Sequence, residues 1–232
     1  MIRQLYIWPV VGLLTLFWSV ISVVASFLFP KRGYPHRCAR RWARMILAAN
    51  GSKVQFFGGD NLVKDRPQIF FCNHQSWVDI VVLTGYLPTS FKWISTKGVF
   101  HVPFLGWHMK RAGYISVERT SFRKAAKALD TALEVIKQGH SLIIFPEGTR
   151  SPDGNLLPFK RGGFVLALRG RFAVVPVTIS GTRKILSKGS LRINKGEVKV
   201  FISPAIDLEK EKPASLGQLV ERTRSSISAN LS

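Results

Sequence analysis

The sequence predicts an α/β fold with a largely parallel central sheet flanked by helices. After residue 50, short apolar runs bounded by turn residues alternate with longer segments of helical periodicity. Strands that alternate with helices pair mostly in parallel, because each helix carries the chain back to the same end of the sheet. Polar clusters follow three of the predicted strands, which is the edge where such sheets bind ligands.

An apolar segment precedes this pattern. Residues 5–29 contain no charged side chain over 25 positions. As a helix they would be about 37 Å long, against about 30 Å of bilayer hydrocarbon. A cleaved signal peptide is the alternative, but its apolar core is usually only about 7–15 residues long. We therefore expect a membrane anchor, which either crosses the bilayer or lies within one leaflet.

A second helix is expected over residues 35–49, basic along one face and suited to an anionic leaflet. Only Arg3 precedes the apolar run, and the first acid of the chain is Asp60. The positive-inside rule then places everything after residue 30 on the cytoplasmic side of the inner membrane. The basic residues that follow the apolar run are Lys31, Arg32, Arg37, Arg40, Arg41 and Arg44.

The whole chain is strongly basic. Its 34 Lys and Arg residues outnumber 13 acids, which gives a formal net charge of +21. Such a charge predicts an anionic partner, and the apolar N-terminus favours a membrane surface or a phosphorylated lipid. We divide the chain into membrane-anchoring helices at 1–50 and an α/β domain at 51–232.

The predicted elements follow in order after residue 50. Apolar or alternating runs predict strands at 53–58, 68–73, 92–95, 114–117, 141–146, 172–180 and 196–203. Helical periodicity predicts helices at 77–87, 103–113, 121–139, 161–170 and 215–231. The clearest of these is 121–139, where Ser121 can cap the first turn and Gly139 ends the helix.

The loop after the strand 68–73 reads "NHQSWVD". Ser76 and Asp79 form an S-x-x-D helix start, so capping alone would account for this carboxylate. Capping does not account for His74. If the helix is capped at Ser76, His74 lies on the bend before it, and Asp79 can hold one imidazole nitrogen while the other accepts a proton. Spacing alone does not decide whether His74 is a structural histidine or a general base.

The loop after the strand 141–146 reads "PEGTRS". Gly148 allows a tight turn, and Arg150 offers a planar fork of donors for phosphate. Glu147 would pair with Arg150 and hold it in place. A solvated Glu–Arg turn is the competing interpretation. Lys97 and Arg119 follow two other strands, and with Arg150 they would gather positive charge for a phosphomonoester.

These motifs resemble those of the glycerolipid acyltransferases. "NHQSWVD" is similar to the family signature N-H-x4-D, and "FPEGTRS" is similar to its F-P-E-G-T-R-S block. "TKGVFHVPFLGWHMKRAGYISVER" resembles the segment between them, and "VVPVTISG" resembles the fourth block. All four stand in family order over residues 70–181, and the nearest resemblance is to the bacterial 1-acylglycerol-3-phosphate acyltransferases.

The resemblance implies a role for each matching residue. His74 would be the general base that takes the proton of the sn-2 hydroxyl, and Asp79 would orient it. The acceptor lipid would be bound by Lys97, Arg119, Glu147, Gly148, Thr149 and Arg150. The sequence departs from the family pattern after Lys97, where Gly98 and Val99 replace an acidic–leucine pair, so the head group of the acceptor stays open.

The implied reaction moves a fatty acyl group from an acyl thioester to 1-acylglycerol-3-phosphate and yields phosphatidate. Acyl-CoA or acyl carrier protein would be the co-substrate, membrane lipids the partners, and no cofactor is expected. No cluster of His, Cys, Asp and Glu has metal-ligand spacing. One alternative is the same chemistry on glycerol-3-phosphate, another lysophospholipid or a lyso-ornithine lipid. A second is a non-enzymatic basic membrane-peripheral protein; nucleic acid is not an expected partner, because no stacking or helix-turn-helix motif is present.

Overall fold

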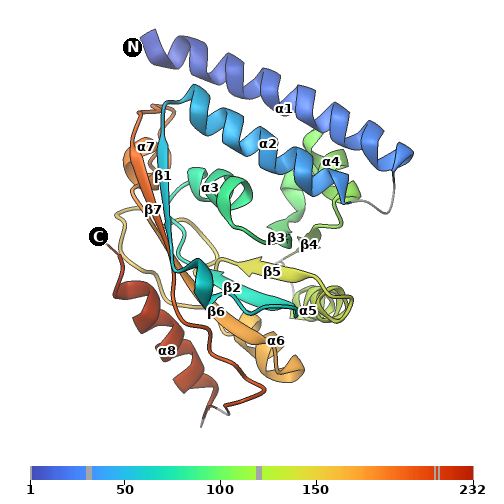
Figure 1. Ribbon diagram of the computed structural model, residues 1–232, viewed down its shortest axis with the longest axis vertical. Coiled ribbons are helices and arrows are strands. Elements are labelled where there is room, and N and C mark those ends of the chain that lie inside the picture. The colour runs from blue at the N-terminus through green and yellow to red at the C-terminus, as the bar shows by residue number, and fades with distance from the viewer. Residues whose placement is uncertain (1, 30–32, 119–121, 212, 214, 232) are drawn as a thin grey trace.

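The computed structural model describes residues 2–29, 33–118, 122–211, 213 and 215–231. Within them the chain forms one mixed sheet with helices on both faces (Figure 1). The strands are β1 Lys53–Phe57, β2 Gln68–Cys72, β3 Phe91–Thr96, β4 Ile115–Val117, β5 Ser141–Ile144, β6 Ala173–Ser180 and β7 Glu197–Ile202. Their order across the sheet is β1-β7-β6-β2-β5-β3-β4.

The expected largely parallel sheet is confirmed. Every neighbouring pair of strands runs in parallel except β6 and β7, which are antiparallel. Because β2, β5, β3 and β4 are adjacent and parallel, the loops that follow them all leave from the same edge of the sheet. This topology brings the polar clusters predicted at separate strand ends to one edge.

Helices cover both faces of the sheet (Figure 1). They are α1 Ile2–Leu28, α2 Tyr34–Ala49, α3 Val78–Tyr86, α4 Leu105–Arg111, α5 Phe122–Lys137, α6 Gly162–Gly170, α7 Thr182–Ile185 and α8 Leu216–Ser228. Two 3₁₀ turns, Gly59–Asn61 and Lys97–His101, interrupt the connections.

The central strand β2 explains why two hydrophobic cores form. Its side chains alternate, so Phe70 and Cys72 join the core beneath α1, α2 and α3. Ile69 and Phe71 join the core beneath α5, α6 and α8. A strand buried on both faces reads as a continuous apolar run, which is what the sequence shows there.

The N-terminal helices lie across one side of the domain, antiparallel to each other (Figure 1). Within the described part of the chain, Arg3–Leu28 is the one helix long and apolar enough to cross a membrane, and only 17% of its most apolar window is buried. Lys31 and Arg32, counted among the basic residues after the apolar run, fall outside the described residues.

The observed bounds differ from the predicted ones mainly at 103–113. The expected short helix is present as α4, but it begins only after Phe104 at φ 60°, and a 3₁₀ turn that was not predicted, Lys97–His101, precedes it. Sequence periodicity missed the short helix α7 altogether, since four residues are too few to show a period. The proposed cap Ser121 lies outside the described residues.

Candidate active site

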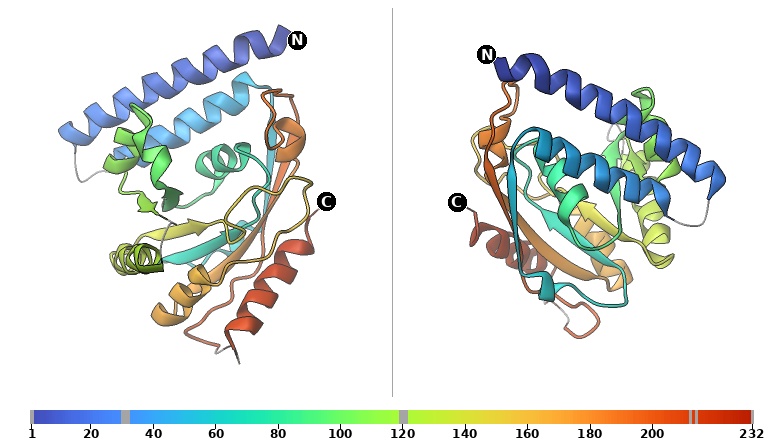
Figure 2. Two further views of the ribbon diagram at one scale, coloured as in Figure 1. Left: turned by 180° about the vertical axis from the view of Figure 1, so that it is seen from behind. Right: turned by 45° about the horizontal axis from the view of Figure 1, so that its top comes forward.

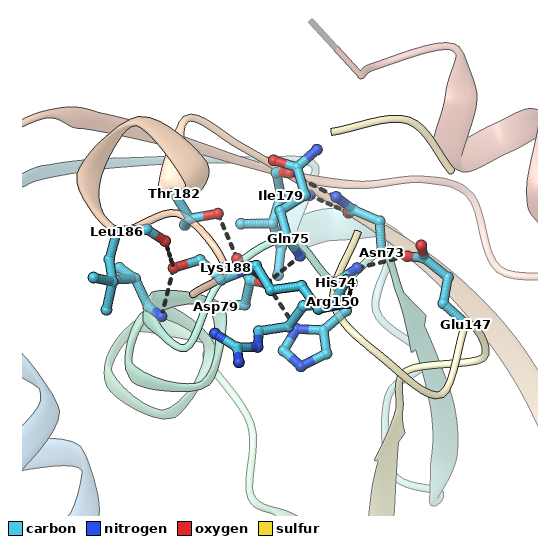
Figure 3. A network of polar contacts seen from close by, with 12 residues as sticks. Asn73, His74, Gln75, Asp79, Glu147, Arg150, Ile179, Thr182, Leu186 and Lys188 are labelled. Carbon is cyan, nitrogen blue, oxygen red and sulfur yellow. Dashed lines mark hydrogen bonds and ion pairs between the residues drawn. The ribbon is translucent and has the colours of Figure 1, made fainter. Parts of the chain in front are cut away.

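His74 and Asp79 meet at the end of β2. The ring Nδ1 of His74 lies 2.8 Å from Asp79 Oδ2, so the predicted contact is confirmed (Figure 3). Asp79 is fully buried, and its Oδ2 also accepts the backbone N–H groups of Gln75 and Ser76 at 2.7 and 2.8 Å. A carboxylate can only accept, so Nδ1 of His74 carries the proton of this bond, and in the neutral imidazole Nε2 then has the free lone pair.

Asp79 both stabilises the start of helix α3 and binds the imidazole of His74. Ser76 Oγ accepts the N–H of Val78 at 3.1 Å, while the Asp79 carboxylate reaches back to the N–H of Ser76. These bonds fix the first turn of α3, which begins at Val78. The helix start therefore holds the carboxylate in the position from which it binds the imidazole.

Thr182 completes the environment of Asp79. Its hydroxyl donates to Oδ1, the carboxylate oxygen that faces away from His74, and both residues are fully buried (Figure 3). The preceding Gly181 adopts φ 93°, and a Cβ there would lie 2.2 Å from the carbonyl oxygen of Glu197. Only glycine fits this turn, which aims Thr182 at the carboxylate. Sequence reasoning missed Thr182; its one signal is its place directly after the fourth motif.

Glu147 supports the loop that carries His74. Its buried carboxylate accepts the backbone N–H of His74 at 2.7 Å and that of Leu157 at 2.9 Å. Burial raises the pKa of Glu147, and the two N–H donors oppose that rise. The expected pairing of Glu147 with Arg150 is thus corrected, because this carboxylate binds backbone N–H groups and the guanidinium lies elsewhere.

Arg150 lies over the indole ring of Trp77, with its guanidinium carbon 4.7 Å from the ring centroid. Lys188 donates to the carbonyl oxygen of Arg150 at 2.8 Å and to Thr149 Oγ1 at 3.4 Å (Figure 3). Neither Trp77 nor Lys188 was assigned to the site from the sequence. Trp77 lies inside the motif "NHQSWVD" at one of its variable positions, and Lys188 lies outside every motif.

Of the two remaining predicted cations, Lys97 lies further along the same edge. Lys97 begins the 3₁₀ turn after β3, and its Nζ is 3.9 Å from Glu118, which follows β4. The Lys97 side chain is more than half exposed. Arg119 directly follows Glu118 and lies outside the described residues.

A cavity of about 530 Å³ opens at His74 and runs beneath the N-terminal helices. Gly148, Thr149 and Arg150 line it at one end together with His74. Its other walls are mostly apolar and aromatic, and they come from α1, α2, α3, β3 and α4; among them are Thr15, Trp18, Ala39, Trp42, Trp93 and Met109. A volume of this size is typical of sites for small organic ligands, and the apolar walls fit a hydrocarbon chain.

The imidazole of His74 is fixed in this opening. Its ring stacks on Phe145, with centroids 3.9 Å apart and planes 10° from parallel.

The buried Cys72 lies nearby at the end of β2, and burial raises the pKa of its thiol well above the ordinary value, so it is protonated and a poor nucleophile. Within the described residues no three His, Cys, Asp or Glu side chains are placed to share a metal ion.

Comparisons with known proteins show which family this chain is similar to. The model of the family described as Acyltransferase matches residues 53–180. A solved structure of the 1-acyl-sn-glycerophosphate acyltransferase of Thermotoga maritima superposes with a TM-score of 0.87 at 26% identity, covering 99% of this chain and 93% of that one.

Two curated relatives are similar over most of this chain. The chloroplast 1-acyl-sn-glycerol-3-phosphate acyltransferase of Arabidopsis thaliana is 37% identical over 88% of this chain, which covers 59% of that protein. The enzyme of the same name from Saccharomyces cerevisiae is 34% identical over 88% of this chain and 69% of its own length. The chain thus spans little more than half of the Arabidopsis relative.

Proposed function

This chain belongs to the acyltransferase family, and on that premise we propose that it acylates the sn-2 hydroxyl of 1-acylglycerol-3-phosphate. The donor is an acyl thioester and the product is phosphatidate. The observation that carries the proposal is the His74–Asp79 pair at the mouth of an apolar cavity, with Arg150 on the same wall. The relatives and the solved structure named above support the choice of acceptor.

His74 acts as the general base in the proposed reaction. Its Nε2 takes the proton of the acceptor hydroxyl as that oxygen attacks the thioester carbonyl. Asp79 holds the tautomer and stabilises the imidazolium that forms. The imidazolium then returns the proton to the departing thiolate. Because the hydroxyl attacks directly, no acyl-enzyme is formed and the reaction calls for no cofactor.

The rest of the site binds the two lipids. We assign the acyl chain to the cavity, and the phosphate of the acceptor to Arg150, with Lys97 and Arg119 as further cations. Gly148 and Thr149 form the wall beside it. Glu147 contributes by holding the backbone of His74 in place. Acyl-CoA and acyl carrier protein are both donors compatible with a net charge of +21.

We further propose that residues 1–50 seat the domain 51–232 on the cytoplasmic membrane, with the site on the cytoplasmic side. Both substrates and the product of the reaction carry acyl chains, and the exposed apolar face of α1 supports this location. The basic residues after α1 add attraction to anionic lipid.

An acceptor panel tests the function. The full chain is incubated with palmitoyl-CoA and, separately, with 1-acylglycerol-3-phosphate, glycerol-3-phosphate, a lysophosphatidylethanolamine and a lyso-ornithine lipid, and products are read by mass. We expect phosphatidate as the main product and no thiol release by His74→Ala. If another acceptor is acylated in preference, the proposed acceptor is wrong. If His74→Ala releases thiol as fast as the wild type, the proposed mechanism is wrong.

A further inference from the structure

The turn before helix α4 and the first turn of this helix expose large apolar side chains. Val102, Phe104 and Trp107 are exposed to 47%, 39% and 54%. The opposite face of α4 is buried and carries His108, whose Nδ1 lies 2.6 Å from the fully buried hydroxyl of Ser22 on α1. From Val102 to His108 this polarity is the reverse of that of a helix on a water-facing surface, whereas the C-terminal end of α4 exposes Lys110 and Arg111.

Helix α1 shows the same reversal beside it. Its buried side chains include Ser19, Ser22 and Ser26, whereas Phe17 and Phe27 are exposed to 53% and 69%. The two helices are in contact, since Arg111 of α4 lies 3.7 Å from the ring centroid of Phe27 (Figure 2). The exposed apolar side chains of α4 and of α1 thus belong to neighbouring helices.

The turn that presents Phe104 is held by a backbone hydrogen bond and by a close approach of its backbone. Phe104 has φ 60° and ψ −54°, a conformation that costs a non-glycine residue about 1–3 kcal/mol and persists only where its surroundings enforce it. Gly106 enforces it here, because its N–H donates to the carbonyl oxygen of Val102 at 2.7 Å and a Cβ on it would lie 2.1 Å from the carbonyl oxygen of Phe100. The rings of Phe104 and Trp107 then pack edge to face, 5.1 Å apart.

Charge around this turn matches an anionic surface. The sequence contains no acid from Ile80 to Val117, and Lys110 and Arg111 are exposed after the turn. Lys97 is exposed before the turn, with Glu118 3.9 Å from its Nζ. Aromatic side chains flanked by Lys and Arg are typical of the boundary between lipid head groups and acyl chains. Water-exposed surfaces of soluble proteins seldom combine these features.

We propose that residues 102–107 are a second lipid-inserting element, separate from the N-terminal helices, whose partner is the anionic leaflet of a membrane. This inference rests on the membrane seating proposed above. With Val102, Phe104 and Trp107 among the acyl chains, Lys97 at the start of the same connection lies at the depth of the phosphates. The end of β3 is thereby held where a lysolipid presents its head group.

Depth measurements on the full chain test this inference without measuring acyl transfer. Phe104→Cys and Trp107→Cys are labelled with an environment-sensitive fluorophore; Cys38 and Cys72 are buried and stay unlabelled. If either variant loses thermal stability, Val102→Cys is labelled in its place. The labelled protein is reconstituted into vesicles of phosphatidylglycerol and phosphatidylcholine. Phe17→Cys on α1 and Glu221→Cys on α8 are the inserted and water-facing references (Figure 1).

We expect lipids brominated on their acyl chains to quench the labels at positions 102, 104 and 107 as they quench position 17, and iodide to quench only position 221. Free access of iodide to positions 104 and 107, with position 17 protected, would overturn the proposal while leaving α1 as the anchor. Loss of bromine quenching at position 17 as well would overturn both the proposal and the membrane seating.

Kinetic measurements test the lipid-inserting element independently. Replacing Phe104 and Trp107 together by Ser should raise KM for 1-acylglycerol-3-phosphate in vesicles by about tenfold, because about half of each ring leaves lipid. The same variant should match the wild type when the acceptor is in detergent micelles. Trp107→Leu, which keeps the side chain apolar, is the matched control. An equal KM for the Ser variant and wild type in vesicles would refute the inference.

Discussion

Replacing Thr182 by Val isolates one hydrogen bond of the proposed catalytic pair. The two side chains have nearly the same shape, so the change removes the hydroxyl that donates to Asp79 Oδ1 and little else. The other three donors to Asp79 all bind Oδ2, which leaves Oδ1 buried without its donor. A hydrogen bond to a charged group contributes about 1.5–3 kcal/mol.

A loss of about 2 kcal/mol in the transition state lowers kcat about 30-fold. KM should stay within about twofold, because Thr182 lies behind Asp79 and away from the residues that line the cavity. Free thiol released from palmitoyl-CoA at saturating 1-acylglycerol-3-phosphate measures kcat, and a thermal unfolding curve shows whether the variant is folded.

Thr182→Ser is the control, because it keeps the donor and removes only a methyl group. It should retain most of the wild-type kcat. A Val variant as fast as the wild type, or a Ser variant as slow as Val, would show that this hydroxyl does not position the catalytic carboxylate.

Three other perturbations test separate parts of the site and its surroundings. Glu147→Gln leaves one of two backbone N–H groups without a carboxylate oxygen and should lower Tm by about 5 °C, as a loss of about 2 kcal/mol does in a domain of this size. Trp77→Leu removes the ring beneath Arg150 and should raise the KM of a phosphomonoester acceptor two- to fivefold at constant kcat, since an exposed cation–π contact contributes about 0.5–1 kcal/mol. His36 and His108 should make the fold sensitive to acid. Burial lowers the pKa of each to about 4 from 6.5, so their contribution is complete above pH 6.5 and is lost as the pH falls through 4, at about 3 kcal/mol each.

Each of these outcomes has a clear contrary result. An unchanged melting curve for Glu147→Gln would remove its supporting role. An equal rise in KM for an uncharged acceptor would show that Trp77 does not act through Arg150. Equal denaturant midpoints at pH 7 and pH 4.5 would contradict the burial of neutral histidines, and His36→Leu should flatten the pH dependence if the argument holds.

The strands and the contact between His74 and Asp79 could be predicted because their signals are local. A buried strand such as β2 reads as an apolar run, and the five-residue spacing of His74 and Asp79 places both at one helix start. The sequence also predicted that the loops after several strands share one edge of the sheet, and they do so because β2, β5, β3 and β4 are parallel neighbours.

The parts that could not be predicted depend on contacts between distant segments. Thr182 is 103 residues from Asp79, and Lys188 is 38 residues from Arg150. No sequence period or motif records such pairs. Glu147 was given the wrong partner for the same reason, because local spacing offers Arg150 and only the folded chain brings the backbone of His74 within 2.7 Å.

The cavity is walled in part by Trp18 and Trp42, which belong to the two helices that precede the sheet. We expect that a fragment without those helices would also lose part of the wall of the cavity to which we assign the acyl chain. For the same reason, joining residues 51–232 to an unrelated membrane anchor should restore attachment to a bilayer without restoring full activity. On this proposal, one pair of helices both attaches the protein to the membrane and shapes its lipid site.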